Sequence, residues 1–157
     1  GFLLVHAGIP PQWSKNEAFL HAELVQNQLQ GDNAESFLSK MYSNEPTKWS
    51  NSLDIEQKSR YTINALMRMR FCKNNGELEF SNKMNADKEP KGYKAWFLHK
   101  NRILKNKEIV FGHWSTLRDI RSKNIYPLDC GCFWGEYLCA LRLNDRVQFS
   151  QRSIESN

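Results

Sequence analysis

Two of the four histidines stand directly after apolar segments, each beside a glycine. The segment "FLLVHAG" reaches His6 and then Gly8, and the segment "EIVFGHW" reaches Gly112 and then His113. Short apolar runs of this kind are typical of buried β-strands. Loops just beyond strand ends are where α/β folds build their sites, and glycine allows a close backbone approach there. An imidazole in that position can present a ring nitrogen to a metal ion or a phosphate.

Either histidine alone is more often a hydrogen-bonded structural residue than a ligand. The matching context of His6 and His113 makes a shared site about as good an explanation. Two imidazoles do not complete a catalytic metal site, because such a site usually needs three or more protein ligands. The sequence has no Asp-x-His and no His-x-x-x-His to supply them. We interpret the other histidines, His21 and His99, as structural or solvated.

Two arginines flank a methionine in "ALMRMRFC", where a predicted helix ends. Alternation along the chain as it leaves the helix would point the guanidinium groups of Arg68 and Arg70 to the same side. Such a pair could hold phosphate oxygens through bidentate hydrogen bonds. The alternative is a pair of surface arginines that the dipole of the helix C-terminus stabilises. From these residues alone the surface alternative is favoured.

The elements that must position these residues can be predicted from periodicity and capping. A strand over residues 2–6 is followed at once by glycine and two prolines, which break it. A helix begins at Ser14, where Ser14 and Glu17 have capping-box spacing, and ends near Gly31. The remaining predicted elements are helices over residues 35–42 and 54–67, the latter capped by Asp54, a hairpin turning at residues 74–76, an exposed loop over residues 83–94, and strands over residues 108–112, 125–129, 137–143 and 147–150.

Helices come first in this chain and strands last, which predicts a mixed α/β (α+β) fold with a sheet packed beneath helices. The 157 residues suffice for one domain, and the tail after Gln151 is expected to be frayed. The net charge of +5 is spread over scattered lysines and arginines, which argues against a long nucleic-acid footprint. No apolar run approaches about 18 residues, so we expect no membrane span.

The four cysteines are expected to be reduced thiols, mostly buried, in a cytoplasmic protein. Cys130 and Cys132 are too close in sequence to pair well with each other. A zinc site is disfavoured because the sequence has no Cys-x-x-Cys.

Four motifs, "VHAGIPPQW", "INALMRMRFC", "FGHW" and "LDCGCFWG", occur here in that order. Together they resemble the symmetrical bis(5'-nucleosyl)-tetraphosphatases, a branch of the calcineurin-like metallophosphoesterases, from Leu3 to about Arg146. The resemblance implies a metallophosphoesterase β-sandwich flanked by helices. It also implies two divalent metal ions, manganese or cobalt by preference, and hydrolysis of diadenosine tetraphosphate to two ADP by a metal-activated hydroxide.

The resemblance carries roles for four residues of this chain. His6 and His113 match the histidines that bind the second metal ion, and Arg68, with Arg70 as the alternative, matches the arginine that holds substrate phosphate. No residue here is assigned as a catalytic acid or base. The family's earlier motifs, "GDxHG", "GDxxxRG" and "GNHD", which supply the other ligands, do not occur in this sequence.

We therefore expect residues 1–150 to form the C-terminal part of a metallophosphoesterase domain, with residues 151–157 as its tail. The expected partners are a dinucleoside polyphosphate and the N-terminal half of the domain, in cis or in trans, without a membrane or a specific nucleic acid. A chain without that half should leave strand faces and edges uncovered, and so be marginally stable, dimeric or partly molten. The alternatives are a non-catalytic remnant that binds nucleotide or protein and, less well supported, a basic RNA-binding module.

Two departures from the family's pattern fall near the expected site. Cys130 stands where threonine is usual, and Glu136 stands where glycine is usual, which puts a carboxylate beside a tight turn. Trp114 and Trp134 could stack on a nucleobase, but packing in the core is the preferred interpretation of both.

Overall fold

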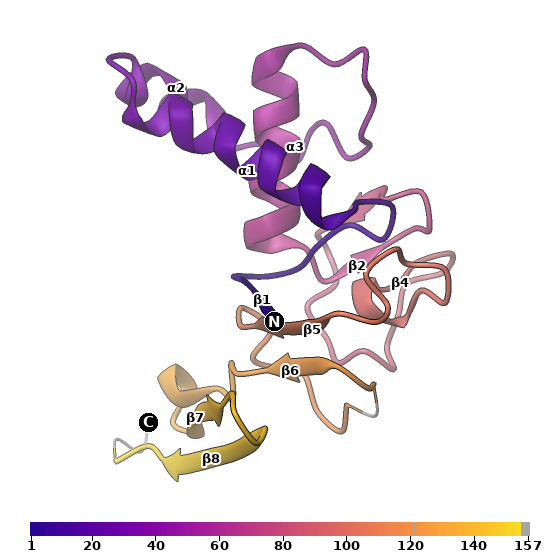
Figure 1. Ribbon diagram of the computed structural model, residues 1–157, viewed down its shortest axis with the longest axis vertical. Helices are drawn as coiled ribbons and strands as arrows, with labels where there is room; N and C mark the ends of the chain where they lie inside the picture. Colours follow the sequence, from indigo (N-terminus) through magenta and orange to yellow (C-terminus); the bar gives the residue numbers. More distant parts are fainter. Residues whose placement is uncertain (121, 155–157) are drawn as a thin grey trace.

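The computed structural model describes residues 1–120 and 122–154, and it has the mixed helix-and-strand composition that the sequence predicts. The helices lie at one end of the long axis, the last two strands lie at the other, and a small sheet lies between them (Figure 1). The elements are β1 (Phe2–Val5), α1 (Lys15–Gln30), α2 (Ala34–Met41), α3 (Ile55–Arg68), β2 (Phe71–Cys72), β3 (Leu78–Glu79), β4 (Lys94–Ala95), the 3-10 helix η1 (Trp96–Leu98), β5 (Glu108–Phe111), β6 (Ile125–Pro127), the 3-10 helix η2 (Cys132–Trp134), β7 (Tyr137–Arg142) and β8 (Val147–Arg152).

The central sheet has the strand order β1-β5-β6, and both of its pairings are parallel. Leu3 pairs with Ile109 and Val5 pairs with Phe111, so that β1 and β5 end at the same edge of the sheet. Leu3, Ile109 and Phe111 are buried in the core beneath the helices. Ile125, which opens β6, is buried with them. The apolar runs found in the sequence therefore form strands, as predicted, and the structure places them side by side, but β1 is only partly buried because Leu3 alone of its residues is in the core.

The helices begin where their caps predict. Glu17 N donates to Ser14 Oγ at 3.2 Å and Ser14 N donates to Glu17 Oε2 at 2.8 Å, which completes the capping box of α1. Asp54 and Gln57 form the same reciprocal pair at the start of α3. Each cap satisfies two backbone N–H groups that would otherwise lack partners at the first turn.

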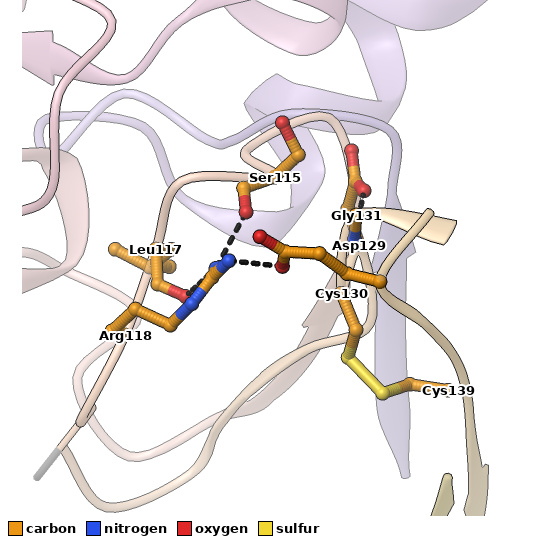
Figure 2. Close-up of a disulfide and its surroundings, with 8 residues drawn as sticks. Ser115, Leu117, Arg118, Asp129, Cys130, Gly131 and Cys139 are labelled. Carbon is orange, nitrogen blue, oxygen red and sulfur yellow. Dashed lines mark hydrogen bonds and ion pairs between the residues drawn. A yellow bond between two sulfur atoms is a disulfide. The ribbon is translucent and has the colours of Figure 1, made fainter. Parts of the chain in front are cut away.

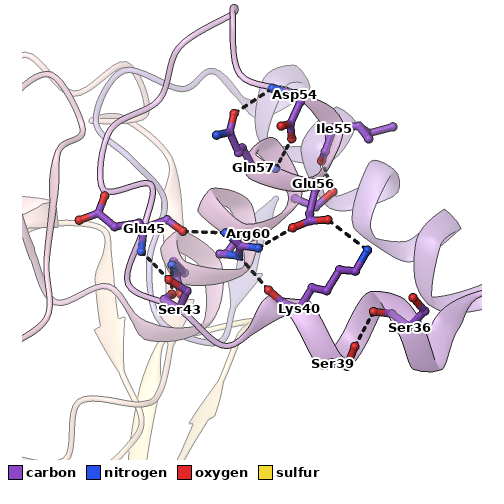
Figure 3. Close-up of polar contacts among 12 residues, drawn as sticks. Ser36, Ser39, Lys40, Ser43, Glu45, Asp54, Ile55, Glu56, Gln57 and Arg60 are labelled. Carbon is purple, nitrogen blue, oxygen red and sulfur yellow. Dashed lines mark hydrogen bonds and ion pairs between the residues drawn. The ribbon is translucent and has the colours of Figure 1, made fainter.

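A polar cluster on Arg60 holds the end of α2 against α3 (Figure 3). Arg60 Nε donates to the Lys40 carbonyl at 2.9 Å, and Arg60 Nη2 contacts Glu56 Oε1 at 2.7 Å. Arg60 Nη1 also donates to the Glu45 carbonyl at 3.3 Å. The first part of the connection between the two helices is therefore held against α3, which matters because residues of this part contact Arg68.

The hairpin predicted around residues 74–76 is confirmed, since β2 and β3 pair in antiparallel register with Phe71 opposite Glu79. Gly76 has a φ of +81°, which glycine adopts without strain. The short strand β4 adds to the other side of β2, and neither β4 nor η1 was predicted. Two-residue strands have no periodicity long enough to detect from sequence.

The loop over residues 83–94 is mostly exposed, as predicted, but it is attached to the rest of the molecule. Ala86 is buried, and the Met84 carbonyl accepts a hydrogen bond from Trp114 Nε1 at 2.9 Å. The Lys83 carbonyl accepts another from Thr116 Oγ1 at 2.6 Å. These bonds attach the loop to the segment that follows β5, a long-range contact that composition does not reveal.

The prediction of four reduced cysteines is wrong, because Cys130 and Cys139 form a disulfide with a Cα–Cα distance of 5.9 Å. The chain reverses through η2 and returns along β7, which brings these two residues together. Cys72, by contrast, is a buried free thiol, and Cys132 is also free. The sequence spacing excluded a Cys130–Cys132 pair but did not reveal the reversal that makes the other pair possible.

The last two strands form an antiparallel ribbon joined by the turn predicted at residues 144–146. β8 runs to Arg152, and residues 155–157 of the expected tail lie outside the described residues. Most residues of the ribbon are exposed, and Leu4 at the edge of the central sheet is 72% exposed. Two-stranded ribbons are marginally stable by themselves. Marginal, dimeric or partly molten behaviour of the chain stays a prediction.

Among the described helices, none is long and apolar enough to cross a membrane.

Gly8 is required by close packing at the end of β1. A Cβ at this position would lie 2.7 Å from Trp96 Nε1 and 2.9 Å from Met69 Cε, and both side chains are buried. We expect Gly8→Ala to lower the free energy of unfolding by about 1–3 kcal/mol, as overpacking does. Urea unfolding measures this change. Gly112→Ala is the control, because its Cβ would meet nothing closer than 3.7 Å. An equal loss in both variants would contradict this account of Gly8.

Candidate functional site

His6 and His113 come together because the strands that precede them are adjacent and parallel. Val5 and Phe111 are paired, so the next residues along the two strands are neighbours, and Gly112 N donates to the His6 carbonyl at 2.9 Å. The centroids of the two imidazole rings lie 5.2 Å apart, with their planes inclined by 50°. The structure thus brings together the two histidines that the sequence analysis singled out. Their role as metal ligands stays a prediction.

The backbone of His113 is strained, since its φ is +63° and it is not glycine. Residues held in this left-handed region are uncommon and concentrate at functional sites. His113 Nε2 lies 3.1 Å from the Arg68 carbonyl. A carbonyl only accepts, so Nε2 carries the proton and Nδ1 of the neutral ring keeps a free lone pair. Metal-binding histidines are commonly oriented by such a bond from the other ring nitrogen.

The environment of His113 keeps its ring neutral. Burial lowers the pKa of His113 to about 4, and the nearby Arg70 cation and the His6 ring act in the same direction. A histidine must be neutral to bind a metal ion. The ring is therefore ready to act as a ligand at neutral pH without first losing a proton.

Arg68 is the last residue of α3 and is held by polar and aromatic neighbours. Its Nη1 donates to Asn64 Oδ1 at 2.8 Å and its Nη2 donates to Asn44 Oδ1 at 2.9 Å. The guanidinium carbon lies 4.6 Å from the centre of the Phe80 ring and 5.7 Å from that of Tyr42. These contacts leave Arg68 with few free donors.

Arg70 lies between α3 and β2, and its Nη2 donates to the His113 carbonyl at 3.1 Å. Its Nε is buried and has no hydrogen-bond partner among the described residues. Burial lowers the pKa of Arg70, while the Asp129 carboxylate opposes that shift. Arg70 thus ties the arginine pair to the histidine pair and keeps unused donors.

A cavity of about 600 Å³ is lined by both arginines, whereas the sequence alone favoured a pair of surface arginines. Two further cations, Lys83 and Arg118, also line it, and Glu136 is its acidic residue. The Arg118 guanidinium makes a close ion pair with Glu136, next to the disulfide-linked segment (Figure 2). No sequence pattern linked these residues, because they come from four separate segments. The lining residues are Tyr42, Arg68, Arg70, Phe80, Lys83, His113, Ser115, Thr116, Arg118, Trp134 and Glu136.

A second cavity of about 440 Å³ lies on the other side of His113, which borders both. His6, Asp129 and the disulfide-bonded Cys130 line this cavity. Asp129 is near enough to influence both His113 and Arg70, and its Oδ1 accepts a hydrogen bond from Gly131 N at 3.2 Å. The sequence analysis missed Asp129, which follows β6 just as the histidines follow their own strands.

The described residues include no group of three or more histidine, cysteine, aspartate or glutamate side chains placed to hold a metal ion. The imidazoles of His6 and His113 are close, and the free Nδ1 of His113 suits a divalent cation. These residues therefore fit two positions of a coordination shell rather than a complete one.

The two tryptophans weighed as base-stacking residues differ. Trp114 is 1% exposed and packs in the core, as preferred. Trp134 is 66% exposed, so the preference for core packing is wrong for it. The reason lies in η2, which glycines in the left-handed conformation bound on both sides and which turns Trp134 outward. His21 packs between two tryptophans, and His99 Nε2 donates to the Cys72 carbonyl at 2.9 Å, so both have structural contacts.

The low pKa of His113 predicts how stability changes with pH. The unfolded chain binds a proton on this histidine near pH 6.5, whereas the folded chain binds it only near pH 4. The unfolded state thus holds more protons between these values, and stability falls as the pH drops from about 6.5 to 4. We expect the variant His113→Gln to flatten part of this slope in urea unfolding.

His21 and His99 have pKa values lowered mainly by burial, so they add slopes of the same sign. The measurement is therefore the difference between the parent chain and His113→Gln across this pH range. Identical slopes in the two chains would contradict the lowered pKa of His113.

Comparison with known proteins shows what the sequence of this chain is similar to. The chain is 43% identical over 144 residues to a "Bis(5'-nucleosyl)-tetraphosphatase, symmetrical" of Cellvibrio japonicus, an alignment that covers 91% of the chain and 53% of that protein. Proteins of the same name from Coxiella burnetii and Pseudomonas fluorescens are 39% and 42% identical, over 94% and 97% of the chain and 51% and 53% of their own lengths. No protein-family model matches the chain.

The chain spans about half the length of the curated relatives that it matches. The resemblance seen in the sequence motifs is confirmed, and it extends over nearly all of this chain. The chain is thus related to the symmetrical bis(5'-nucleosyl)-tetraphosphatases, of which it matches about half.

Proposed function

We propose that this chain supplies part of the active site of a metal-dependent phosphohydrolase that cleaves diadenosine tetraphosphate into two ADP. One observation carries the proposal. The imidazoles of His6 and His113 lie 5.2 Å apart, and His113 also lines the cavity that Arg68 and Arg70 line. The names of the relatives support the same reaction.

The histidines are proposed to be metal ligands. His6 and His113 would each offer a ring nitrogen to the same ion, the second of two divalent ions. The resemblance implies that manganese or cobalt is preferred. When bound, such ions would activate water as a nucleophile and neutralise charge on the phosphoryl group. We propose that the remaining ligands come from the other half of the domain, in cis or in trans, within a calcineurin-like β-sandwich.

The arginines are proposed to bind phosphate oxygens. Arg70 is the better candidate for direct contact, because its Nη2 makes its one side-chain hydrogen bond to the described residues while Arg68 is held by Asn64 and Asn44. Arg68 then contributes charge and supports the cavity wall. With Lys83 and Arg118, four cations face one carboxylate in this cavity, which favours a ligand with several negative charges.

A second candidate function is nucleotide binding without hydrolysis. The observation that favours it is the incomplete set of metal ligands among the described residues. Two neutral imidazoles hold divalent ions weakly unless carboxylates join them. A chain acting alone would then bind polyphosphate through its arginines and leave it intact.

The decisive experiment follows ADP release from diadenosine tetraphosphate with Mn²⁺. We expect hydrolysis when the 157-residue chain is combined with the half of the Cellvibrio japonicus relative that it does not match. His113→Ala removes a proposed metal ligand. It should lower the rate by at least about 100-fold, because the loss of a group that only orients a ligand already costs up to about that much.

The control is Asp32→Asn, which changes an exposed side chain between α1 and α2 that does not line the cavity, and it should leave the rate within about two-fold, as substitutions at exposed positions do. If no combination releases ADP while the chain still binds the substrate, nucleotide binding is the function. Equal rates for the parent chain and His113→Ala would contradict the proposed histidine role.

A further inference from the structure

Two large aromatic side chains stand exposed at the cation-lined cavity. Tyr42 is 91% exposed and Trp134 is 66% exposed, and both line this cavity. Trp13, Trp96 and Trp114, by contrast, are at most 2% exposed. Exposed aromatic rings beside a group of cations are better explained as a ligand-binding surface than by packing.

We infer that Tyr42 and Trp134 are stacking platforms for the two nucleobases of a dinucleotide whose phosphate chain crosses the arginines between them. The inference rests on the proposed function, because it takes the cavity to be the phosphate-binding part of that site. It adds a basis for recognising the dinucleotide, since a ligand with one base would use one platform.

The Tyr42 platform belongs to the helical wall of the cavity. Tyr42 caps the C-terminus of α2, and the Arg60 contacts to the Lys40 carbonyl and Glu56 hold this end of α2 in place (Figure 3). The Arg68 guanidinium lies 5.7 Å from the Tyr42 ring centre. A base stacked on Tyr42 would therefore place its first phosphate close to Arg68.

The Trp134 platform belongs to the wall formed by the C-terminal segment. Trp134 N donates to the Gly131 carbonyl at 2.8 Å and Gly135 N donates to the Cys132 carbonyl at 3.0 Å, which closes the turn. The disulfide of Cys130 fixes one side of this turn, and the Glu136 ion pair with Arg118 fixes the other (Figure 2). These contacts therefore fix the backbone that carries the Trp134 ring.

The chemistry of the lining fits such a ligand. Aromatic rings stack on any nucleobase because every base has a π-face, and each stack contributes about 5- to 150-fold in affinity. Arg70 and Arg118 come from segments between the two platforms in the chain and line the same cavity. Cations in the middle and rings on two walls match an anionic chain with a base at each end.

The test is a series of three ligands that share one phosphate chain, titrated into the full chain in EDTA by calorimetry. The ligands are inorganic tetraphosphate, adenosine tetraphosphate and diadenosine tetraphosphate. We expect affinity to rise about 5-fold or more with each base. Tyr42→Ala and Trp134→Ala should each remove the gain in affinity that one base provides. Tyr42→Phe and Trp134→Phe should keep most of that gain.

Controls separate the two proposals. Phe19→Ala removes an exposed aromatic on α1, outside this cavity, and should change no affinity. Arg70→Ala should weaken all three ligands alike. If tetraphosphate binds through Arg70 but bases add nothing, or the alanine variants weaken tetraphosphate equally, the base platforms are wrong and the phosphate site stands. If tetraphosphate does not bind, the phosphate site fails and the platforms fail with it.

Discussion

The parallel pairing of β1 with β5 is the constraint on which the rest of this structure depends. Val5 lies opposite Phe111, so His6 and Gly112 must follow side by side, and the bond from Gly112 N to the His6 carbonyl extends the pairing. A shift of one residue in either strand would turn its side chains to the opposite face of the sheet. The close packing of Gly8 on Trp96 then sends the chain away toward α1. The histidine pair thus depends on the register, and the register keeps Leu3, Ile109 and Phe111 in the core together.

Positive charges lie close together next to the histidine pair, although they repel one another. Arg70 binds the His113 carbonyl, and the pKa values of both Arg70 and His113 are lowered, chiefly by burial. Asp129 partly offsets the positive charge from the other side. An anion entering the cavity would relieve both the repulsion and the desolvation of the arginines. Such an arrangement would favour an anion in the cavity, as the proposed phosphate-binding role requires.

Features that depend on local pattern were predictable from the sequence. The apolar runs before His6 and His113 indicated strands, and the capping box at Ser14 and the cap at Asp54 located two helix starts. Alternation allowed Arg68 and Arg70 to share one side, and both line one cavity, although the surface alternative was favoured from the sequence. Each of these signals lies within a few residues of the feature that it predicts, so no knowledge of the tertiary fold was needed.

Features that depend on chain reversal were not predictable. The disulfide between Cys130 and Cys139 exists because η2 turns the chain back, and the same turn carries Trp134 outward. Lys83 lines the cavity from a loop that was predicted to be polar and exposed, and its carbonyl accepts a hydrogen bond from Thr116. The parallel β1–β5 pair joins residues about one hundred positions apart. The matching context of His6 and His113 left a shared site as an open alternative, and the resemblance to a family favoured it.

Binding of a paramagnetic ion tests the central claim most directly, because it reports which histidines lie within reach of one metal. Imidazole NMR signals of the 157-residue chain would be followed while Mn²⁺ is added in small steps. The account predicts that the signals of His6 and His113 broaden together, at the same Mn²⁺ concentration, while those of His21 and His99 stay sharp. Broadening of only one of the pair, or equal broadening of all four, would contradict the shared metal site.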